Sequence, residues 1–233
     1  MRLAVPQAIE LPRPGRLVQR LGLRGLATVF AAALAGAFVA LLAYGVMAQS
    51  PNTSIDVGLA RGQAPVAPQF RLALLSRGRL GPVLGGRLAD TLRGPFVSLR
   101  ALRGTPVVLN FYASWCVTCR AEAPTLERAW RLLARPRGVL LLGLDMQDAP
   151  DDAYAYARQY GIDYTSVHDP SNAVARSYGV TGLPETFFID AAGRVVGHVI
   201  GISTTAQLAA GIAAALEGRV GGTDVGGAQR PLK

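Results

Sequence analysis

The apolar positions of this chain form one long uninterrupted run and several short ones. From Leu26 to Ala48, in "LATVFAAALAGAFVALLAYGVMA", no charged residue and no proline occurs. A helix over this run would reach about 34 Å, enough for a bilayer core of about 30 Å. The arginines of residues 1–25 precede it, and Asp56 is the first charge that follows. The positive-inside rule therefore predicts a cytoplasmic basic segment over 1–25, a single-pass cell-membrane anchor over 26–48 and an extracytoplasmic remainder.

A cleaved signal peptide is the alternative, because "VMA" before Gln49 places small residues where a signal peptidase would cut. The apolar run is longer than the roughly 7–15 residues usual in a signal peptide, and the basic segment before it is long, so an uncleaved anchor is favoured. Both alternatives put the folded part in an oxidising compartment, where a cysteine pair can cycle through a disulfide.

Shorter apolar runs alternate with stretches of helical spacing in the second half of the chain. Buried strands are predicted for "TPVVLNFY" (105–112) and "GVLLLGLD" (138–145), and "ETFFID" and "RVVGHVI" around "AAGR" predict a hairpin. Helices are predicted from the cysteines to about Ala134 and over 151–160, 171–179 and 204–218. This order predicts an α/β domain with a mixed central sheet flanked by helices on both faces.

Segments rich in glycine or proline mark the predicted boundaries of this domain. Residues 49–66 predict a linker between membrane and domain. The domain is expected over 67–218, with an inserted loop or irregular hairpin at about 75–96, where glycines and prolines fit no regular element. The glycine-rich residues 219–233 predict a disordered tail.

The net charge of +9 does not by itself indicate a nucleic-acid partner. Outside the first 25 residues the basic side chains are scattered, and no run of Lys or Arg is interleaved with aromatic residues, as a nucleic-acid-binding surface would be. We therefore expect no nucleic acid among the partners of this chain.

Both cysteines lie in "ASWCVTCRAEAP", residues 113–124. Their spacing allows a disulfide, half of a metal site or two buried thiols. A strand ending near Tyr112 and a helix beginning near Cys116 place the first cysteine at a helix N-terminus, where free N–H groups and the helix dipole favour a thiolate. Cys119 lies on the same helix face and can attack a mixed disulfide held by Cys116, as dithiol–disulfide exchange requires.

A metal site is disfavoured, because zinc needs further ligands and only His168 and His198 are available, without paired spacing. His168 is expected in a loop and His198 in a strand, both as structural residues. Two inert structural thiols remain an alternative for the cysteines. Exchange chemistry needs no prosthetic group, so the only redox centre expected is a Cys116–Cys119 disulfide.

The string "VVLNFYASWCVTCRAEAPTLE", followed further along by "YGVTGLPETFFIDAAGRVVGHVIG", resembles the thioredoxin superfamily. Within it the string resembles the membrane-anchored TlpA/ResA/CcmG (DsbE) thiol–disulfide oxidoreductases, over roughly residues 64–217. The resemblance implies a thioredoxin-like fold, with Cys116 as the nucleophile and Cys119 as the resolving cysteine. Pro124 supports it, because the superfamily carries a proline at this offset inside the helix.

The resemblance also assigns residues that would bind the substrate. Trp115 is expected to shield the sulfur and to offer a flat contact surface. Pro184 matches the superfamily's cis-proline, which presents backbone to the extended chain of the partner. Leu183 and Glu185 flank this proline and are expected to belong to the same substrate-binding segment, in which "LPET" is closest to the CcmG branch.

Glu122 coincides with an acidic residue that ResA-like proteins place beside the disulfide. It is therefore a candidate catalytic residue that would hold or pass the proton that Cys119 loses before it attacks. A solvated helix glutamate is the alternative. Asn110 departs from the superfamily, which has a buried Asp at this offset, so a proton relay cannot run through position 110.

Taken with the apolar run, the resemblance implies a membrane-tethered extracytoplasmic thiol–disulfide oxidoreductase. It would reduce disulfides of exported proteins, such as those of apocytochrome c, with electrons from a membrane thiol reductase. Two alternatives remain: an oxidant that donates disulfides to exported proteins, and a non-catalytic metal carrier. Copper carriers of this fold generally use CxxxC with a distant His, and the two-residue spacing in this chain argues against that role.

Overall fold

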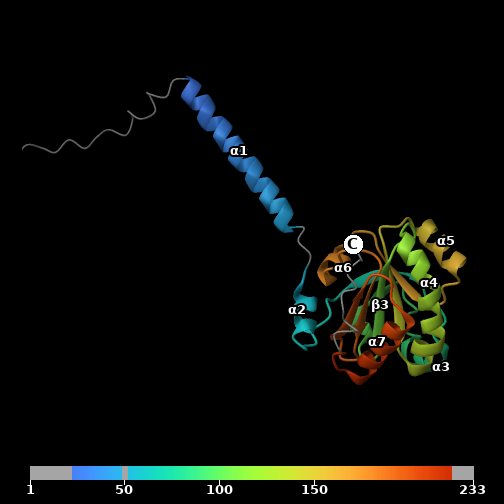
Figure 1. Ribbon diagram of the computed structural model, residues 1–233. Helices are drawn as coiled ribbons and strands as arrows, with labels where there is room; N and C mark the ends of the chain where they lie inside the picture. Colours follow the sequence, from blue (N-terminus) through green and yellow to red (C-terminus); the bar gives the residue numbers. More distant parts are fainter. Residues whose placement is uncertain (1–22, 49–51, 222–233) are drawn as a thin grey trace, which may run out of the picture. The chain divides into compact units, whose positions relative to one another are not determined.

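The computed structural model describes residues 23–48 and 52–221, which belong to two compact units, Met1–Ser50 and Pro51–Lys233 (Figure 1). Residues 1–22 of the predicted cytoplasmic segment 1–25 lie outside the described residues. The predicted tail 219–233 lies outside them from position 222 onward.

Helix α1 (Leu23–Ala48) forms the described part of the first unit. Over Gly25–Gly45 it is long and apolar enough to cross a membrane. Its large apolar side chains are exposed, Leu41 by 68% and Phe30 by 66%. Water disfavours a continuous apolar surface of this kind. The helix is consistent with either a signal anchor or a signal peptide.

The second unit is built on a seven-stranded sheet in the order β2-β1-β5-β4-β3-β6-β7. The inner strands β3, β4 and β5 run parallel, whereas all other neighbours pair antiparallel. The strands are β1 (Arg71–Ser76), β2 (Phe96–Ser98), β3 (Val107–Tyr112), β4 (Leu140–Met146), β5 (Thr165–Asp169), β6 (Glu185–Ile189) and β7 (Val195–Ile200). Every residue of β3 and β4 is buried, as expected of parallel strands covered on both faces.

Helices cover both faces of the sheet, and the alternation of side chains along β3 shows which helix covers which face (Figure 1). Asn110 and Tyr112 face the first layer, where Asn110 bonds to α4 and Tyr112 stacks on α5. Phe111 faces the second layer and packs on Tyr178 of α6. The first layer consists of α4 (Val117–Ala129), α5 (Pro150–Tyr160) and α7 (Thr205–Glu217), and the second includes α2 (Ser54–Ala60) and α6 (Ala173–Tyr178).

Helix α7 lies unusually close to β6. A Cβ atom on Gly211 would collide with the ring of Phe188, so only glycine allows this approach. The helix begins with a complete capping box in which Thr204 and Gln207 satisfy each other's backbone N–H groups. The cap fixes the start of α7 directly after Ser203, whose backbone N–H donates to Glu122 of α4.

The prediction of a linker over 49–66 is wrong for residues 54–60, which form helix α2. Ile55 is only 2% exposed, and Gly58 lies against the ring of Pro65. Asn52 Nδ2 donates to the carbonyl of Ser177 at 2.9 Å. The small residues and prolines that predict a free tether instead allow close packing on the domain.

Residues 75–96 are more ordered than the sequence predicts. β1 and β2 pair antiparallel at the two ends of this segment, and helix α3 (Gly81–Leu88) lies between them in the chain. Leu84, Leu88 and Leu92 follow each other at helical spacing and are all 3% exposed or less. The surrounding glycines hide this apolar periodicity in the sequence.

Strand β5 is absent from the prediction, and His168, expected in a loop, lies in it. Its sequence, "TSVHD", has no apolar run by which a buried strand is recognised. The strand forms because its backbone pairs with β4 on one side and β1 on the other. Tertiary pairing here overrides weak local preference.

Candidate active site

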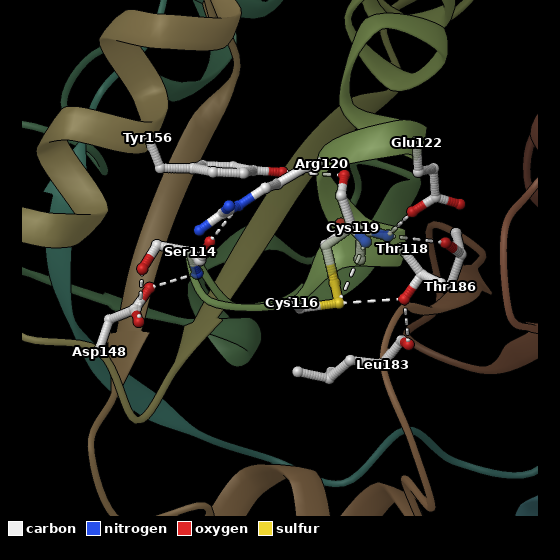
Figure 2. Close-up of a disulfide and its surroundings, with 11 residues drawn as sticks. Ser114, Cys116, Thr118, Cys119, Arg120, Glu122, Asp148, Tyr156, Leu183 and Thr186 are labelled. Atoms are coloured by element: carbon white, nitrogen blue, oxygen red, sulfur yellow. Dashed lines mark hydrogen bonds between the residues drawn. A yellow bond between two sulfur atoms is a disulfide. The ribbon is translucent and has the colours of Figure 1, made fainter.

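The two cysteines form a disulfide at the start of helix α4 (Figure 2). Cys116 is the N-cap residue, and its Sγ accepts the backbone N–H of Cys119 at 3.1 Å. The Cα atoms are 5.2 Å apart, within the normal range for a disulfide. Cys116 is 6% exposed and Cys119 1%. The sulfur at the helix start is therefore the more accessible one, and the same helix end favours negative charge on it after reduction.

Thr118 links the disulfide to the loop that precedes β6 (Figure 2). Its Oγ1 lies 3.2 Å from Cys116 Sγ and donates to the carbonyl of Leu183 at 3.0 Å. The peptide bond between Leu183 and Pro184 is cis, as the resemblance implies. Thr118 thus connects the disulfide to a loop that is far away in the sequence.

A groove of about 550 Å³ opens beside Cys116. One wall is the start of α4, where Trp115 is 55% exposed and Val117 75%. The opposite wall is the loop Val180–Leu183. Large apolar side chains exposed around a groove are typical of a surface that binds another chain.

Glu122 lies one helical turn beyond Cys119 and is completely buried (Figure 2). Its Oε1 accepts the backbone N–H of Ser203 at 2.6 Å, and its Oε2 accepts from Asn110 Nδ2 at 3.1 Å. The same Asn110 group also donates to Thr186 Oγ1 at 3.0 Å. Glu122 is thus no solvated helix residue, contrary to the alternative drawn from its position in the sequence.

The surroundings of Glu122 make it a carboxyl that gains and loses a proton near neutral pH. Burial raises its pKa from 4.5 to about 7, although the hydrogen bonds from Ser203 and Asn110 lower it. Perturbed carboxyls of this kind are characteristic of sites that move protons. Among the described side chains, no Lys or Arg forms an ion pair with it.

Glu185 does not lie where the sequence predicts. It is fully buried, so its carboxylate cannot contact a bound partner, and its assignment to the substrate-binding surface is wrong in this respect. Its Oε1 accepts from Thr181 N at 2.9 Å and Gly182 N at 3.0 Å, and its Oε2 lies 3.0 Å from His198 Nε2. The residue supports the groove wall from behind, because its side chain points to the second-layer face of the sheet, where it bonds both to His198 and to the loop.

Several residues at the site carry no signal in the sequence. Asp148 accepts from Ser114 N at 2.6 Å, and Arg120 Nε donates to Ser114 O at 2.8 Å, so both hold the turn before Cys116 (Figure 2). Tyr156 OH donates to the carbonyl of Cys119 at 3.1 Å. Thr118 could have been found from its place between the cysteines. The other contacts join distant parts of the chain. Among the described residues, no cluster of three or more His, Cys, Asp or Glu side chains is placed to hold a metal ion.

The mixed sheet between helix layers and the disulfide at a helix start beside a cis-proline define a thioredoxin-like thiol–disulfide oxidoreductase. Residues 67–198 match the AhpC/TSA family, and the chain belongs to this family. Its chemistry is exchange between the Cys116–Cys119 pair and the thiols or disulfides of other proteins.

The chain is also similar to individual proteins that are named as thiol–disulfide oxidoreductases or interchange proteins. The chain is 31% identical to the thiol:disulfide interchange protein HelX of Rhodobacter capsulatus over 159 residues, 68% of this chain and 77% of HelX. It is 32% identical to the thiol-disulfide oxidoreductase ResA of Bacillus thuringiensis over 117 residues, 50% of this chain and 67% of ResA. Among solved structures, MTB dsbF superposes with a TM-score of 0.52 and 25% identity, covering 66% of this chain and all of dsbF (100%).

Proposed function

We propose that this protein is a membrane-tethered, extracytoplasmic reductase of disulfides in exported proteins, among them apocytochrome c. Helix α1 would serve as the uncleaved anchor, with the basic residues before it in the cytoplasm and the second unit outside. The length and apolar composition of α1 support the anchor. The resemblance to the TlpA/ResA/CcmG group supports the substrate class and a membrane thiol reductase as the electron donor.

The reaction starts from the reduced pair. The Cys116 thiolate attacks one sulfur of the partner's disulfide, a bond forms between Cys116 Sγ and that sulfur, and the other partner sulfur leaves as a thiolate and takes a proton. Cys119, deprotonated, then attacks Cys116 Sγ and displaces the second partner thiolate. Two electrons pass from the cysteine pair to the partner, and the membrane reductase returns two electrons to the Cys116–Cys119 disulfide.

The observation that carries this proposal is the asymmetry of the two sulfurs. Cys116 Sγ sits at the helix start beside the groove and accepts the N–H of Cys119, whereas Cys119 lies behind it at 1% exposure. A thiolate at position 116 keeps that hydrogen bond, which stabilises the charge. Cys119 is bonded to Cys116 Sγ in the oxidised pair, so it can reach that sulfur in a mixed disulfide, and its burial shields it from other partners, as a resolving thiol needs.

Glu122 serves as the proton acceptor for Cys119 in this scheme. With its pKa raised to about 7, roughly half of Glu122 is ionised at neutral pH, so it can both accept a proton and release it. Trp115 and Leu183, which line the groove, bind the partner's strand. Pro184 is buried and its carbonyl accepts from Gly201 N, so it acts on the partner through its cis bond to Leu183. Glu185 acts on that binding surface only through the loop it supports.

The experiment is a pair of single substitutions in the full-length protein. Cys116→Ser removes the nucleophile, and we expect the rate of insulin disulfide reduction to fall to the uncatalysed level. Cys119→Ser keeps the nucleophile and removes the resolving thiol, so it should accumulate mixed disulfides with its partners in cells, which gel electrophoresis without reductant would detect. Unchanged turnover in Cys116→Ser would refute the proposal.

The direction of electron flow is tested by a redox titration of the wild-type pair. A reductase requires a reduction potential at or below that of its substrates. A value well above roughly −180 mV would identify the oxidant alternative instead. Identification of the proteins trapped by Cys119→Ser would show whether apocytochrome c is among them.

A further inference from the structure

His198 of β7 occupies a buried position between two carboxylates on the second layer of the sheet. Its Nδ1 lies 2.7 Å from Asp56 Oδ1, and its Nε2 lies 3.0 Å from Glu185 Oε2. The ring stacks on Phe187 at a centroid distance of 3.9 Å. The side chain is 2% exposed, so water does not compete for either nitrogen.

Each ring nitrogen faces a carboxylate oxygen, and an ionised carboxylate accepts hydrogen bonds but cannot donate one. A neutral imidazole carries one N–H and would leave a lone pair against the other carboxylate, whereas an imidazolium donates to both. Burial lowers the pKa of His198, but the hydrogen bonds and charges of Asp56 and Glu185 outweigh it and raise the pKa above 6.5. The geometry therefore fits a charged ring that joins the two acids.

The contacts continue from this ring to the reactive sulfur. The second oxygen of Glu185 accepts from Thr181 N, Thr181 Oγ1 and Gly182 N. The next residue of that loop, Leu183, accepts at its carbonyl from Thr118, whose Oγ1 lies 3.2 Å from Cys116 Sγ. Loop 181–183 is one wall of the groove.

We infer that His198 is a positioning residue for disulfide exchange: it joins Asp56 of α2 to Glu185 and thereby fixes loop 181–183 in the position that binds the partner's strand. The inference rests on the proposed function in one respect, that the partner binds in this groove. Asp56 belongs to the first helix after the anchor segment in the chain, so the stretch that leads to the membrane contributes directly to the shape of the groove.

This arrangement has a defined pH dependence. The titratable groups that face the ring are Asp56 from α2 and Glu185 from β6, both acids. Since the pKa of His198 is raised, the doubly bonded form is complete below pH 6.5 and is lost as the pH rises through the higher pKa of the folded state. Partner binding in the groove should weaken over that range. The intrinsic reactivity of Cys116 should instead depend on the ionisation of its own thiol.

The test is a single-turnover experiment on the reduced full-length protein in detergent, with a peptide that contains one disulfide. His198→Gln keeps a donor near Glu185 but cannot carry charge or bridge to Asp56. We expect its half-saturating peptide concentration to rise roughly fivefold with a limiting rate within about twofold of wild type. The pH dependence of half-saturation should disappear. The reaction with 5,5′-dithiobis(2-nitrobenzoic acid), too small to span the groove, should stay within about twofold of wild type.

His168→Gln is the matched control, because His168 also bonds to a buried acid, Asp145 at 2.8 Å, but has no link to the loop. It should leave half-saturation unchanged. Asp56→Asn provides a second variant whose exposed site tolerates change, and should shift half-saturation in the same direction as His198→Gln by a smaller factor. Wild-type half-saturation in both variants, or an equal loss of reaction with the small reagent and the peptide, would overturn the inference. Failure of the wild-type protein to reduce the peptide would instead count against the proposed function.

Discussion

Two glutamates flank the active site from opposite faces of the sheet, and their surroundings differ completely. Glu122 on α4 lies in the first layer with Asn110 and Thr186, and Glu185 on β6 lies in the second layer with His198. Both side chains are fully buried. Glu122 has two neutral donors, whereas Glu185 has three donors on one oxygen and a histidine on the other.

The difference shows that burial alone does not decide what a carboxyl does. Without a cation, burial brings the pKa of Glu122 to about 7, and a proton exchanges there at physiological pH. With a histidine and a fixed set of donors, Glu185 holds a loop in place. The same residue type is thus a carboxyl with a pKa near neutral on one side of the sheet and a hydrogen-bond acceptor for a loop on the other.

The largest effect on the free energy of unfolding is expected when the carboxylate of Glu185 is removed. Glu185→Ala leaves the buried His198 with one partner and the loop donors with none, and the free energy of unfolding should fall by about 4 kcal/mol. Urea denaturation at pH 7 would measure it. The control is Glu217→Ala, which removes an exposed ion pair with Arg219 and should change the free energy by less than about 0.5 kcal/mol. Equal, small changes in both variants would show that Glu185 is not a structural centre.

A slightly smaller effect, visible only through pH, is expected at Glu122. Because its pKa rises from 4.5 to about 7 on folding, its neutral form stabilises the fold, and that contribution is present below pH 4.5 and lost as the pH rises through 7. A pKa difference of about 2.5 corresponds to ~3 kcal/mol. Glu122→Gln stays neutral, and a flipped Asn110 side chain can present its otherwise unpartnered Oδ1 to the new amide.

Relative to wild type, Glu122→Gln should therefore gain about 3 kcal/mol in unfolding free energy between pH 4.5 and pH 8. Urea denaturation of the oxidised proteins at the two pH values would measure this. The same variant should also slow the attack of Cys119 on a trapped mixed disulfide near pH 7. A difference between the proteins that is constant with pH would contradict the proton-exchanging role.

The smallest effect is expected at Thr118, which connects the helix with the disulfide to the loop that Glu185 supports. Thr118→Val keeps the shape of the side chain and loses the hydrogen bond to Leu183 O, so the unfolding free energy should fall by about 0.5 kcal/mol at this exposed site. Half-saturation by a peptide disulfide should rise about twofold, because the loop loses one of its supports. Combined with His198→Gln, the two changes should be less than additive; full additivity would mean that the two residues act on different structures.

The site residues that the sequence predicts are those that belong to short motifs of neighbouring residues. Cys116, Cys119 and Trp115 are adjacent in one motif, and Pro184 stands in a second one, so a pattern of a few residues identifies them. Glu185 belongs to the same pattern and was still misplaced, because its direction depends on which face of β6 it occupies. Asp56 and His198 are 142 positions apart, and no local pattern relates them.

The fold follows the same division. Strands β3 and β4 and helix α4 are predicted because continuous apolar runs and helical spacing are local properties. Strand β5 and helix α2 are not, since β5 is short and polar, α2 has only seven residues, and the structure of both depends on pairing and packing with distant segments.

By itself, the sequence determined a cysteine pair at a helix start, an apolar segment long enough for a bilayer and the α/β class of the domain. Only the tertiary structure decided which carboxyl exchanges protons and which one holds the groove. The physical reason is that both properties depend on the balance of burial against donors and charges, and those neighbours come from elements that the chain brings together only when it folds.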